Sequence, residues 1–355
     1  MKPGTARAFA SRRRAHSRVP GPESLSLGSL GVARVTRKRK TNIPMKTTTT
    51  LAACAVAMAT SNSTLRADNF GTIGNTFTID FVNIGNPGNA DYFGYGGVGY
   101  NYRMGTYEIS QDAITKATAS GLANVVAGAW AGNRPAALMT WYECAAFVNW
   151  LNTSTGHHAA YDLTFSGSWS KNLWSSAEAW QLDGQNLYRH KDAYYFLPNE
   201  DEWYKAAFHK NDGVTANYWN YATGSSSIPD GIDSGTDTVF DAVFADPFNQ
   251  VSPNVVTNVG LGSAYGTFGQ DGNVSEMMEG DYGAPYSDAR VTRGGYWASP
   301  ESSLRFPYRS SAIGPTTADE SIGFRVASVI PEPASAILFL FCATAALATR
   351  RRRAH

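Results

Sequence analysis

The sequence predicts an α+β fold that is rich in loops and has few short helices and strands. Its 355 residues suffice for one large domain or two small ones, and 43% hydrophobic against 17% charged residues can supply a sizeable core. The 18 Tyr, 9 Trp and 34 Gly suit short strands and tight turns better than a helix bundle. Helical periodicity is clear in only two segments.

In chain order, the first predicted element is a strand that begins at Phe77 and ends in a turn rich in Gly, Asn and Pro. Tyr100, Tyr102 and Met104 then alternate along the chain as a strand requires, and Ser110 can cap a helix that follows. Residues 224–237 show no periodicity, which predicts a loop.

The first clear helix begins after Thr140. Thr140 and Glu143 have the spacing of a capping box, in which each satisfies a backbone N–H of the first turn. Four residues then share one face of the helix: Cys144, Phe147, Val148 and Leu151. Because Cys144 lies on this face, we interpret it as a core residue rather than a nucleophile.

The second clear helix begins after Asn199, which can cap it. Three acidic residues occupy the first turn, where the helix dipole favours anions: Glu200, Asp201 and Glu202. We interpret this acidic cluster as helix-stabilising rather than catalytic. The inward face of this helix is predicted to carry Trp203, Ala206 and Ala207.

Charge and cysteine usage exclude two classes of site. Eleven basic residues lie within 1–44 and four more at 350–353, so residues 67–330 hold 13 basic against 27 acidic residues. Such a body lacks the basic stripe of a nucleic-acid surface, and we expect no nucleic-acid partner. Cys54 and Cys342 lie in apolar terminal segments, so Cys144 stands alone and neither an internal disulfide nor a CxxC zinc site is possible in the body.

Residues 45–67 have the three parts of a secretory signal peptide. Lys46 leads, an apolar run from 51 to 59 follows, and small residues come before a polar start at Asp68. We expect cleavage after Ala67 or, alternatively, after Ala59; a short buried helix is the competing interpretation. We attribute the basic extension 1–44 to a wrongly assigned start upstream of Met45, and a genuine disordered arm is the alternative.

Residues 329–353 combine a Pro-Glu-Pro motif (Pro331, Glu332, Pro333), an apolar run at 334–349 and a terminal arginine cluster. The run is shorter than the roughly 20 residues that a spanning helix usually needs, and the arginines would stay cytoplasmic. This order resembles the PEP-CTERM sorting signal. The resemblance implies an exosortase partner, a short transmembrane helix with transient inner-membrane insertion, and a final place at the cell surface or outside the cell. A plain membrane anchor is the alternative.

Residues 75–328 resemble the formylglycine-generating, sulfatase-modifying-factor family. Seven blocks occur in the family's order: RMGTYEIS, LMTWYECAAFVNWLN, LPNEDEWYKAAF, YGTFGQDGNVSEM, RVTRGGYW, YRSS and IGFRVAS. The resemblance implies one domain with the formylglycine-generating-enzyme fold, a C-type-lectin-like variant with little regular secondary structure, usually with bound calcium.

The resemblance also implies a catalytic copper held by two thiolates, which are soft ligands that suit Cu(I). Counted without gaps from Gly294 and Gly295, the two thiolate positions fall on Ser299 and Leu304. Because neither residue is a thiol, we expect no copper site and assign no catalytic residue. Whether the chain is an enzyme stays open at this point.

Two calcium sites are implied by the same resemblance, built from backbone carbonyls and a few side chains, as a hard cation prefers. The predicted ligands of the first site are Gly269, Gly272, Val274 and, as the carboxylate, Glu276. The alternative role of Glu276 is a structural carboxylate that accepts N–H donors. The predicted ligands of the second site are Asn217, Tyr218, Asp230 and Ile232.

Two classes of function compete. We favour an exported, monomeric, calcium-stabilised binding module that lacks formylglycine-generating catalysis and holds an extracellular polysaccharide or protein. The missing thiols and the sorting tail favour this interpretation. The alternative is an active formylglycine-generating oxidoreductase that modifies a sulfatase cysteine, which the family resemblance favours.

Overall fold

A computed structural model describes residues 66–330, apart from 127, 246–249, 284–287 and 311. The chain divides into two compact units, Met1–Thr60 and Ser61–His355, and all described residues lie in the second unit. The basic extension and most of the signal segment therefore fall outside the described residues, as does the sorting segment from residue 331.

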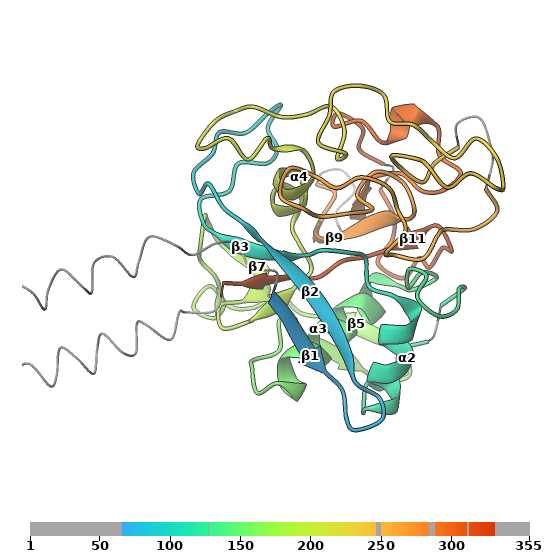
Figure 1. Ribbon diagram of the computed structural model, residues 1–355. Helices are drawn as coiled ribbons and strands as arrows, with labels where there is room; N and C mark the ends of the chain where they lie inside the picture. The colour runs from blue at the N-terminus through green and yellow to red at the C-terminus, as the bar shows by residue number, and fades with distance from the viewer. Residues whose placement is uncertain (1–65, 127, 246–249, 284–287, 311, 331–355) are drawn as a thin grey trace, which may run out of the picture. The chain divides into compact units, whose positions relative to one another are not determined.

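The main sheet has five strands in the order β1-β2-β3-β12-β8, and each neighbouring pair is antiparallel. Its first hairpin, drawn in blue in Figure 1, joins β1 to β2. The strands are β1 Arg66–Phe70, β2 Phe77–Ile84, β3 Tyr102–Gly105, β8 Tyr195–Phe196 and β12 Ala327–Val329. The sheet thus joins the start of the domain to its end.

Three α-helices occur among the described residues, and all begin at the caps that the sequence predicts. They are α2 Gln111–Ala119, α3 Trp141–Ser154 and α4 Glu200–Phe208, with Ser110, Thr140 and Asn199 as N-caps. The predicted capping box at Thr140 is present, and a second box joins Asn199 to Glu202. These caps satisfy orphan N–H groups and fix the first turn of each helix.

The hydrophobic core lies on both faces of β2. Phe77, Ile79 and Phe81 pack in one cluster with residues of α2 and α3, while Val82 and Ile84 pack in another. Cys144 is buried in the first cluster, which confirms the prediction that it is a core residue.

The remaining elements are short. A second sheet has the order β10-β9-β11, in which β9 is antiparallel to β10 and parallel to β11, and two hairpins, β4–β5 and β6–β7, lie outside both sheets. Their bounds are β4 Leu163–Phe165, β5 Trp169–Lys171, β6 Ala179–Trp180, β7 Asn186–His190, β9 Ser275–Asp281, β10 Arg290–Arg293, β11 Ile322–Gly323 and a 3-10 turn at Glu301–Ser303. The predicted α+β, loop-rich fold is confirmed.

Two details differ from the sequence prediction. Strand β1 begins at Arg66, so the main sheet includes residues before the predicted domain start at residue 75. Tyr100 precedes β3 rather than lying in it, and all four residues of β3 are buried, so burial does not distinguish its two faces. No helix among the described residues is both long and apolar enough to cross a membrane.

Candidate functional site

The two positions that the sequence count assigns to copper thiolates, Ser299 and Leu304, both lie beside one glycine. Strand β10 ends at Arg293, and Gly294 and Gly295 follow with φ of +94° and +71°, a region that favours glycine. A Cβ atom placed on Gly295 would lie 3.3 Å from Ser299 Cβ and 3.0 Å from Leu304 Cδ2. The structure therefore places both side chains next to Gly295, and their assignment as thiolate positions stays a prediction.

The side chains at these positions do not fit a copper ion. The Ser299 hydroxyl accepts a hydrogen bond from the Tyr296 backbone N–H at 3.0 Å, and Leu304 packs in a small hydrophobic cluster with Tyr221 and Phe244. Neither offers the soft sulfur that Cu(I) prefers. Among the described residues the free thiol is Cys144, and burial raises its pKa well above the usual value, so it stays protonated inside α3.

Glu276 lies in β9 and is held by three N–H donors from two residues of other segments. Arg325 Nε donates to Glu276 Oε2 at 2.6 Å and its Nη2 donates to Oε1, while Trp203 Nε1 also donates to Oε2 at 2.6 Å. The Arg325 side chain is fully buried. This is the structural role that the sequence left open for Glu276, and a calcium ion bound to this carboxylate would have to displace the guanidinium group.

Two of the other predicted ligands of the first calcium site, Gly269 and Val274, lie beside a second buried carboxylate, Glu108. Asn273 Nδ2 donates to Glu108 Oε2 at 2.7 Å, and the Val274 N–H donates to Oε1 at 3.3 Å. A Cβ on Gly269 would lie 3.1 Å from Glu108 Oε2. Burial, and then the charge of Glu276, raises the pKa of Glu108 well above its usual value. Sequence reasoning missed Glu108, because it lies on a loop far away in the chain.

Gly272 is fixed by backbone contacts. Its N–H donates to the Gly294 carbonyl at 2.7 Å, and a Cβ there would lie 2.0 Å from the Val243 carbonyl, so only glycine fits. No group of three or more His, Cys, Asp or Glu side chains is placed to hold a metal ion within the part of the chain that the structure describes. Calcium at this site stays a prediction.

The predicted ligands of the second calcium site make contacts with different partners rather than with one another. Asn217 Nδ2 donates to Asp212 Oδ2 at 2.8 Å, and the Tyr218 ring packs in a different hydrophobic cluster from Ile232. The Asp230 N–H donates to Asp241 Oδ2 at 3.1 Å. The sorting residues Pro331, Glu332 and Pro333 lie outside the described residues.

The three acidic residues of the first turn of α4 have three different partners. Glu200 pairs with Arg293 at 2.7 Å and with Arg309 at 2.9 Å. Glu202 pairs with Arg189 at 2.9 Å. Asp201 Oδ1 accepts from the Gly96 N–H at 2.9 Å. Each of the three therefore ties α4 to another segment, and their helix-stabilising role stays an interpretation.

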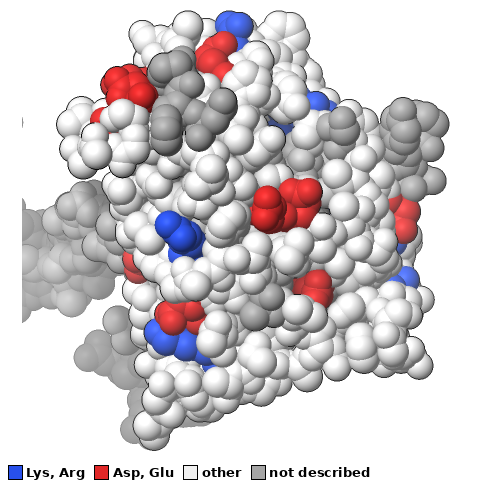
Figure 2. Space-filling model, turned by 90° about the vertical axis from the view of Figure 1, so that its right-hand side faces the viewer, with Lys and Arg blue, Asp and Glu red and all other residues white. Residues whose placement is uncertain are grey.

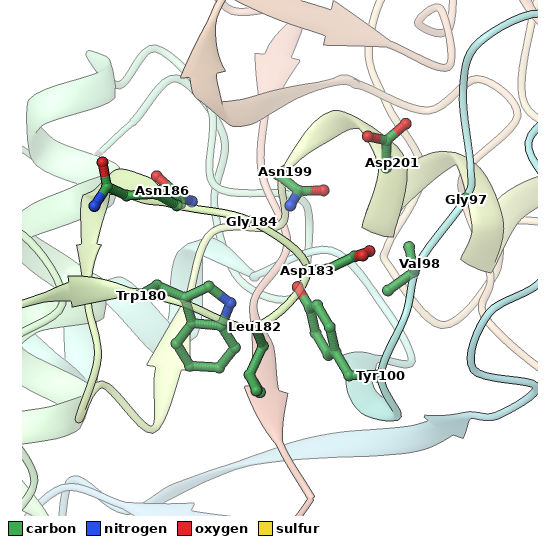
Figure 3. Close-up of a pocket in the computed structure, with 11 residues that line it drawn as sticks. Gly97, Val98, Tyr100, Trp180, Leu182, Asp183, Gly184, Asn186, Asn199 and Asp201 are labelled. Carbon is green, nitrogen blue, oxygen red and sulfur yellow. The ribbon is translucent and has the colours of Figure 1, made fainter. Parts of the chain in front are cut away.

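Asp201 also faces a cavity of about 220 Å³ that the sequence did not reveal, named here the Trp180 pocket. Figure 3 shows side chains from three segments around this space. They come from the chain before β3, from the β6–β7 hairpin and from the start of α4: Val98, Tyr100, Trp180, Asp183, Asn199 and Asp201. The acidic turn of α4 was the one feature of the sequence that pointed to this pocket. The rest could not be predicted, because the three segments are widely separated along the chain.

A buried ion network supports this pocket. Arg189 pairs with Glu202 at 2.9 Å and with Glu279 at 2.8 Å, and all three side chains are fully buried. The Tyr100 hydroxyl donates to Glu202. Burial, and then the nearby Glu202, raises the pKa of Tyr100 far above its ordinary value, so the phenol remains a donor. The pocket wall is thus held by charge pairs that leave it little freedom to move.

Comparisons with known proteins agree with this architecture. A family model described as "Sulfatase-modifying factor enzyme 1-like domain" matches residues 35–330. Among solved structures, variable protein 1 of Treponema denticola is 18% identical with a TM-score of 0.50, over 75% of this chain and 100% of that one. The structure of CarF is 20% identical with a TM-score of 0.51, over 71% of this chain and 99% of that one. These likenesses show the fold alone, and no curated protein matches the chain.

Proposed function

The chain belongs to the family of sulfatase-modifying factor enzyme 1-like domains, and from this we propose that it is an exported member that binds a ligand and does not generate formylglycine. The supporting observation is the meeting of Ser299 and Leu304 beside Gly295. The scaffold keeps the place where the family resemblance expects two thiolates, but the residues there are a hydrogen-bonded hydroxyl and a buried leucine. Neither can bind Cu(I) as a thiolate does.

The alternative is an active formylglycine-generating oxidoreductase that modifies a sulfatase cysteine. Family membership favours it. It would need a source of oxidation chemistry other than a copper dithiolate at Ser299 and Leu304. The two proposals therefore differ in one measurable property, which is the conversion of a sulfatase cysteine to an aldehyde.

Export is the second part of the proposal. It is supported by the signal-like segment 45–67 and by the Pro331–Pro333 motif with its apolar run and arginines, which imply an exosortase partner. An extracellular polysaccharide or protein would then be the ligand. Intact-mass measurement on protein from the surface of the native host tests this: a chain that ends near Pro333 is expected, and one that keeps the terminal arginines at 350–353 contradicts it.

A nucleic-acid partner is not part of the proposal. The face in Figure 2 carries isolated Lys and Arg side chains rather than a continuous basic area. Nucleic-acid binding depends on several closely spaced cations that replace the counterions of the phosphates. The acidic excess of residues 67–330 supports the same expectation.

Cu(I) titration tests the copper part of the proposal. Wild-type protein should show no stoichiometric Cu(I) binding in the presence of a competing chelator of known affinity. The double variant Ser299→Cys/Leu304→Cys should bind one Cu(I), because the two side chains meet beside Gly295. The single variants Ser299→Cys and Leu304→Cys are the matched controls. Stoichiometric Cu(I) binding by the wild type would favour the oxidoreductase. If the double variant folds but binds no Cu(I), the two positions are not placed to share a metal ion, and the proposal loses its geometric support.

A further inference from the structure

The Trp180 pocket contains a buried donor that has no partner. Trp180 is only 4% exposed, and its indole Nε1–H donates to no acceptor among the described residues. The same side chain lines the pocket, and in Figure 3 its ring nitrogen points toward the space beside Tyr100. An unpaired N–H in such a place costs free energy in the empty protein and can be satisfied by a ligand acceptor.

Two aspartates supply the complementary acceptors. Asp183 Oδ2 accepts from the Gly99 N–H at 2.6 Å, and Asp201 Oδ1 accepts from the Gly96 N–H at 2.9 Å. The second oxygen of each carboxylate takes no hydrogen bond from the residues that the structure describes. Asn199 uses its side-chain oxygen to cap α4, which leaves its amide N–H groups for the pocket.

These groups select the chemistry of the ligand. An anionic ligand would meet two carboxylates and no Lys or Arg on the pocket wall. A simple cation would pair with the carboxylates but would leave the indole N–H of Trp180 unsatisfied, because a cation offers no acceptor. A hydroxyl group both donates and accepts, so several hydroxyls on one small molecule satisfy both kinds of partner.

Shape points the same way. The pocket holds about 220 Å³, which is below the usual range for drug-sized ligands and suits one small ring. The accessible lining is mainly polar, with Asp183 and Asp201 among the residues that supply it, and Val98, Tyr100 and Trp180 add a small apolar area. A sugar ring has this combination of an apolar face and a hydroxylated rim.

We propose that the Trp180 pocket binds a single neutral, hydroxyl-rich sugar ring. This inference rests on the proposed function as a binding module and names the class of ligand. The pocket and the Gly295 position are lined by different residues. Failure of sugar binding would therefore leave the copper experiment unchanged, and copper binding in the wild type would leave the sugar experiment unchanged.

Ligand-observed saturation-transfer NMR on the purified full chain tests the proposal. The probes are the methyl glycosides of glucose, galactose, mannose and N-acetylglucosamine. Saturable binding of at least one of them is expected in the millimolar range. Glucuronate, putrescine and calcium chloride serve as the anionic and cationic comparison probes.

Three variants locate the binding. Asp201→Asn and Asp183→Asn each replace the free acceptor oxygen by a donor, and asparagine tolerates the φ of +58° at residue 183. Each should weaken sugar binding at least tenfold. Asp112→Asn is the matched control, because Asp112 is the second residue of α2 as Asp201 is of α4, so it loses the same first-turn charge away from the pocket.

The proposal is overturned by any of three results. The first is that no neutral glycoside binds at concentrations up to about 50 mM, far above the millimolar range expected. The second is that Asp201→Asn and Asp183→Asn bind the sugar with the same affinity as the control Asp112→Asn. The third is that glucuronate, putrescine or calcium binds at the pocket while every neutral glycoside fails.

Discussion

Asp201 carries a charge that the fold destabilises. Burial raises the pKa of Asp201 to about 6, with further contributions from the charges of Glu200, Glu202 and Asp183. An aspartate in an unfolded chain titrates near about 3.9. The folded chain therefore binds more protons than the unfolded chain between these values, and the stability contribution of Asp201 falls as the pH rises from about 4 to 6.

This loss of stability with rising pH predicts the effect of Asp201→Asn. At pH 7 the variant should be more stable than the wild type by about 1–2 kcal/mol, after allowance for partial exposure. At pH 4 the gain should vanish, because wild-type Asp201 is then protonated. Urea unfolding at both pH values, with Asp112→Asn as the control, measures the difference. A variant that is less stable than the wild type at pH 7 would show that the carboxylate serves the fold rather than a ligand.

Substitution of Glu276 should lower the stability of the protein, whereas Asp201→Asn should raise it. Glu276→Gln leaves the Arg325 guanidinium buried without its counter-charge, and removing one partner of a buried pair costs about 3–5 kcal/mol. A large fall in the melting temperature is expected, both with calcium and with excess chelator. If calcium stabilises the wild type but not Glu276→Gln, the carboxylate is a calcium ligand and the assignment of Glu276 to Arg325 is contradicted.

At the scale of elements, the predictions that succeeded used signals close together in the sequence. A capping box needs two residues three apart, so Thr140 and Glu143 were enough to place the start of α3. Strand β1 has no such signal, because its sequence RADNF is largely polar and becomes a strand by pairing with β2. The ion pair of Glu276 and the Trp180 pocket join segments far apart in the chain, so spacing alone could not reveal them.

Strand β1 also bears on the signal cleavage site. Arg66 and Ala67 pair with Phe81 and Asp80 of β2, so cleavage after Ala67 would remove two residues from the strand. Cleavage after Ala59 would leave β1 whole. Asp68 accepts from Arg103 Nη2 at 2.6 Å, and a new ammonium group at residue 68 would lie close to this guanidinium.

A chain that starts at Asp68 should therefore be less stable than one that starts at residue 60, by about 1 kcal/mol for the lost ladder bonds. Thermal unfolding of the two proteins, expressed without a signal peptide, measures this difference. Equal melting temperatures would mean that the first two residues of β1 add nothing to the sheet.

For the molecule as a whole, the sequence predicted the family, which the family model confirms, and the proposed loss of catalysis depends on the residues beside Gly295. The scaffold is held by its sheets, its helix caps and its buried ion pairs. The proposal rests on the chemistry of two side chains, because Ser299 and Leu304 stand at the expected thiolate positions and neither is a thiol.

Mass spectrometry of a cysteine-containing sulfatase peptide tests this central claim most directly. The peptide is incubated with the full chain, copper and a reductant under air, and its mass is followed over time. The peptide should keep its thiol, as it does without protein, because Ser299 and Leu304 provide no Cu(I) ligand. Conversion of the cysteine to an aldehyde that requires the protein would contradict the claim and identify an active formylglycine-generating oxidoreductase.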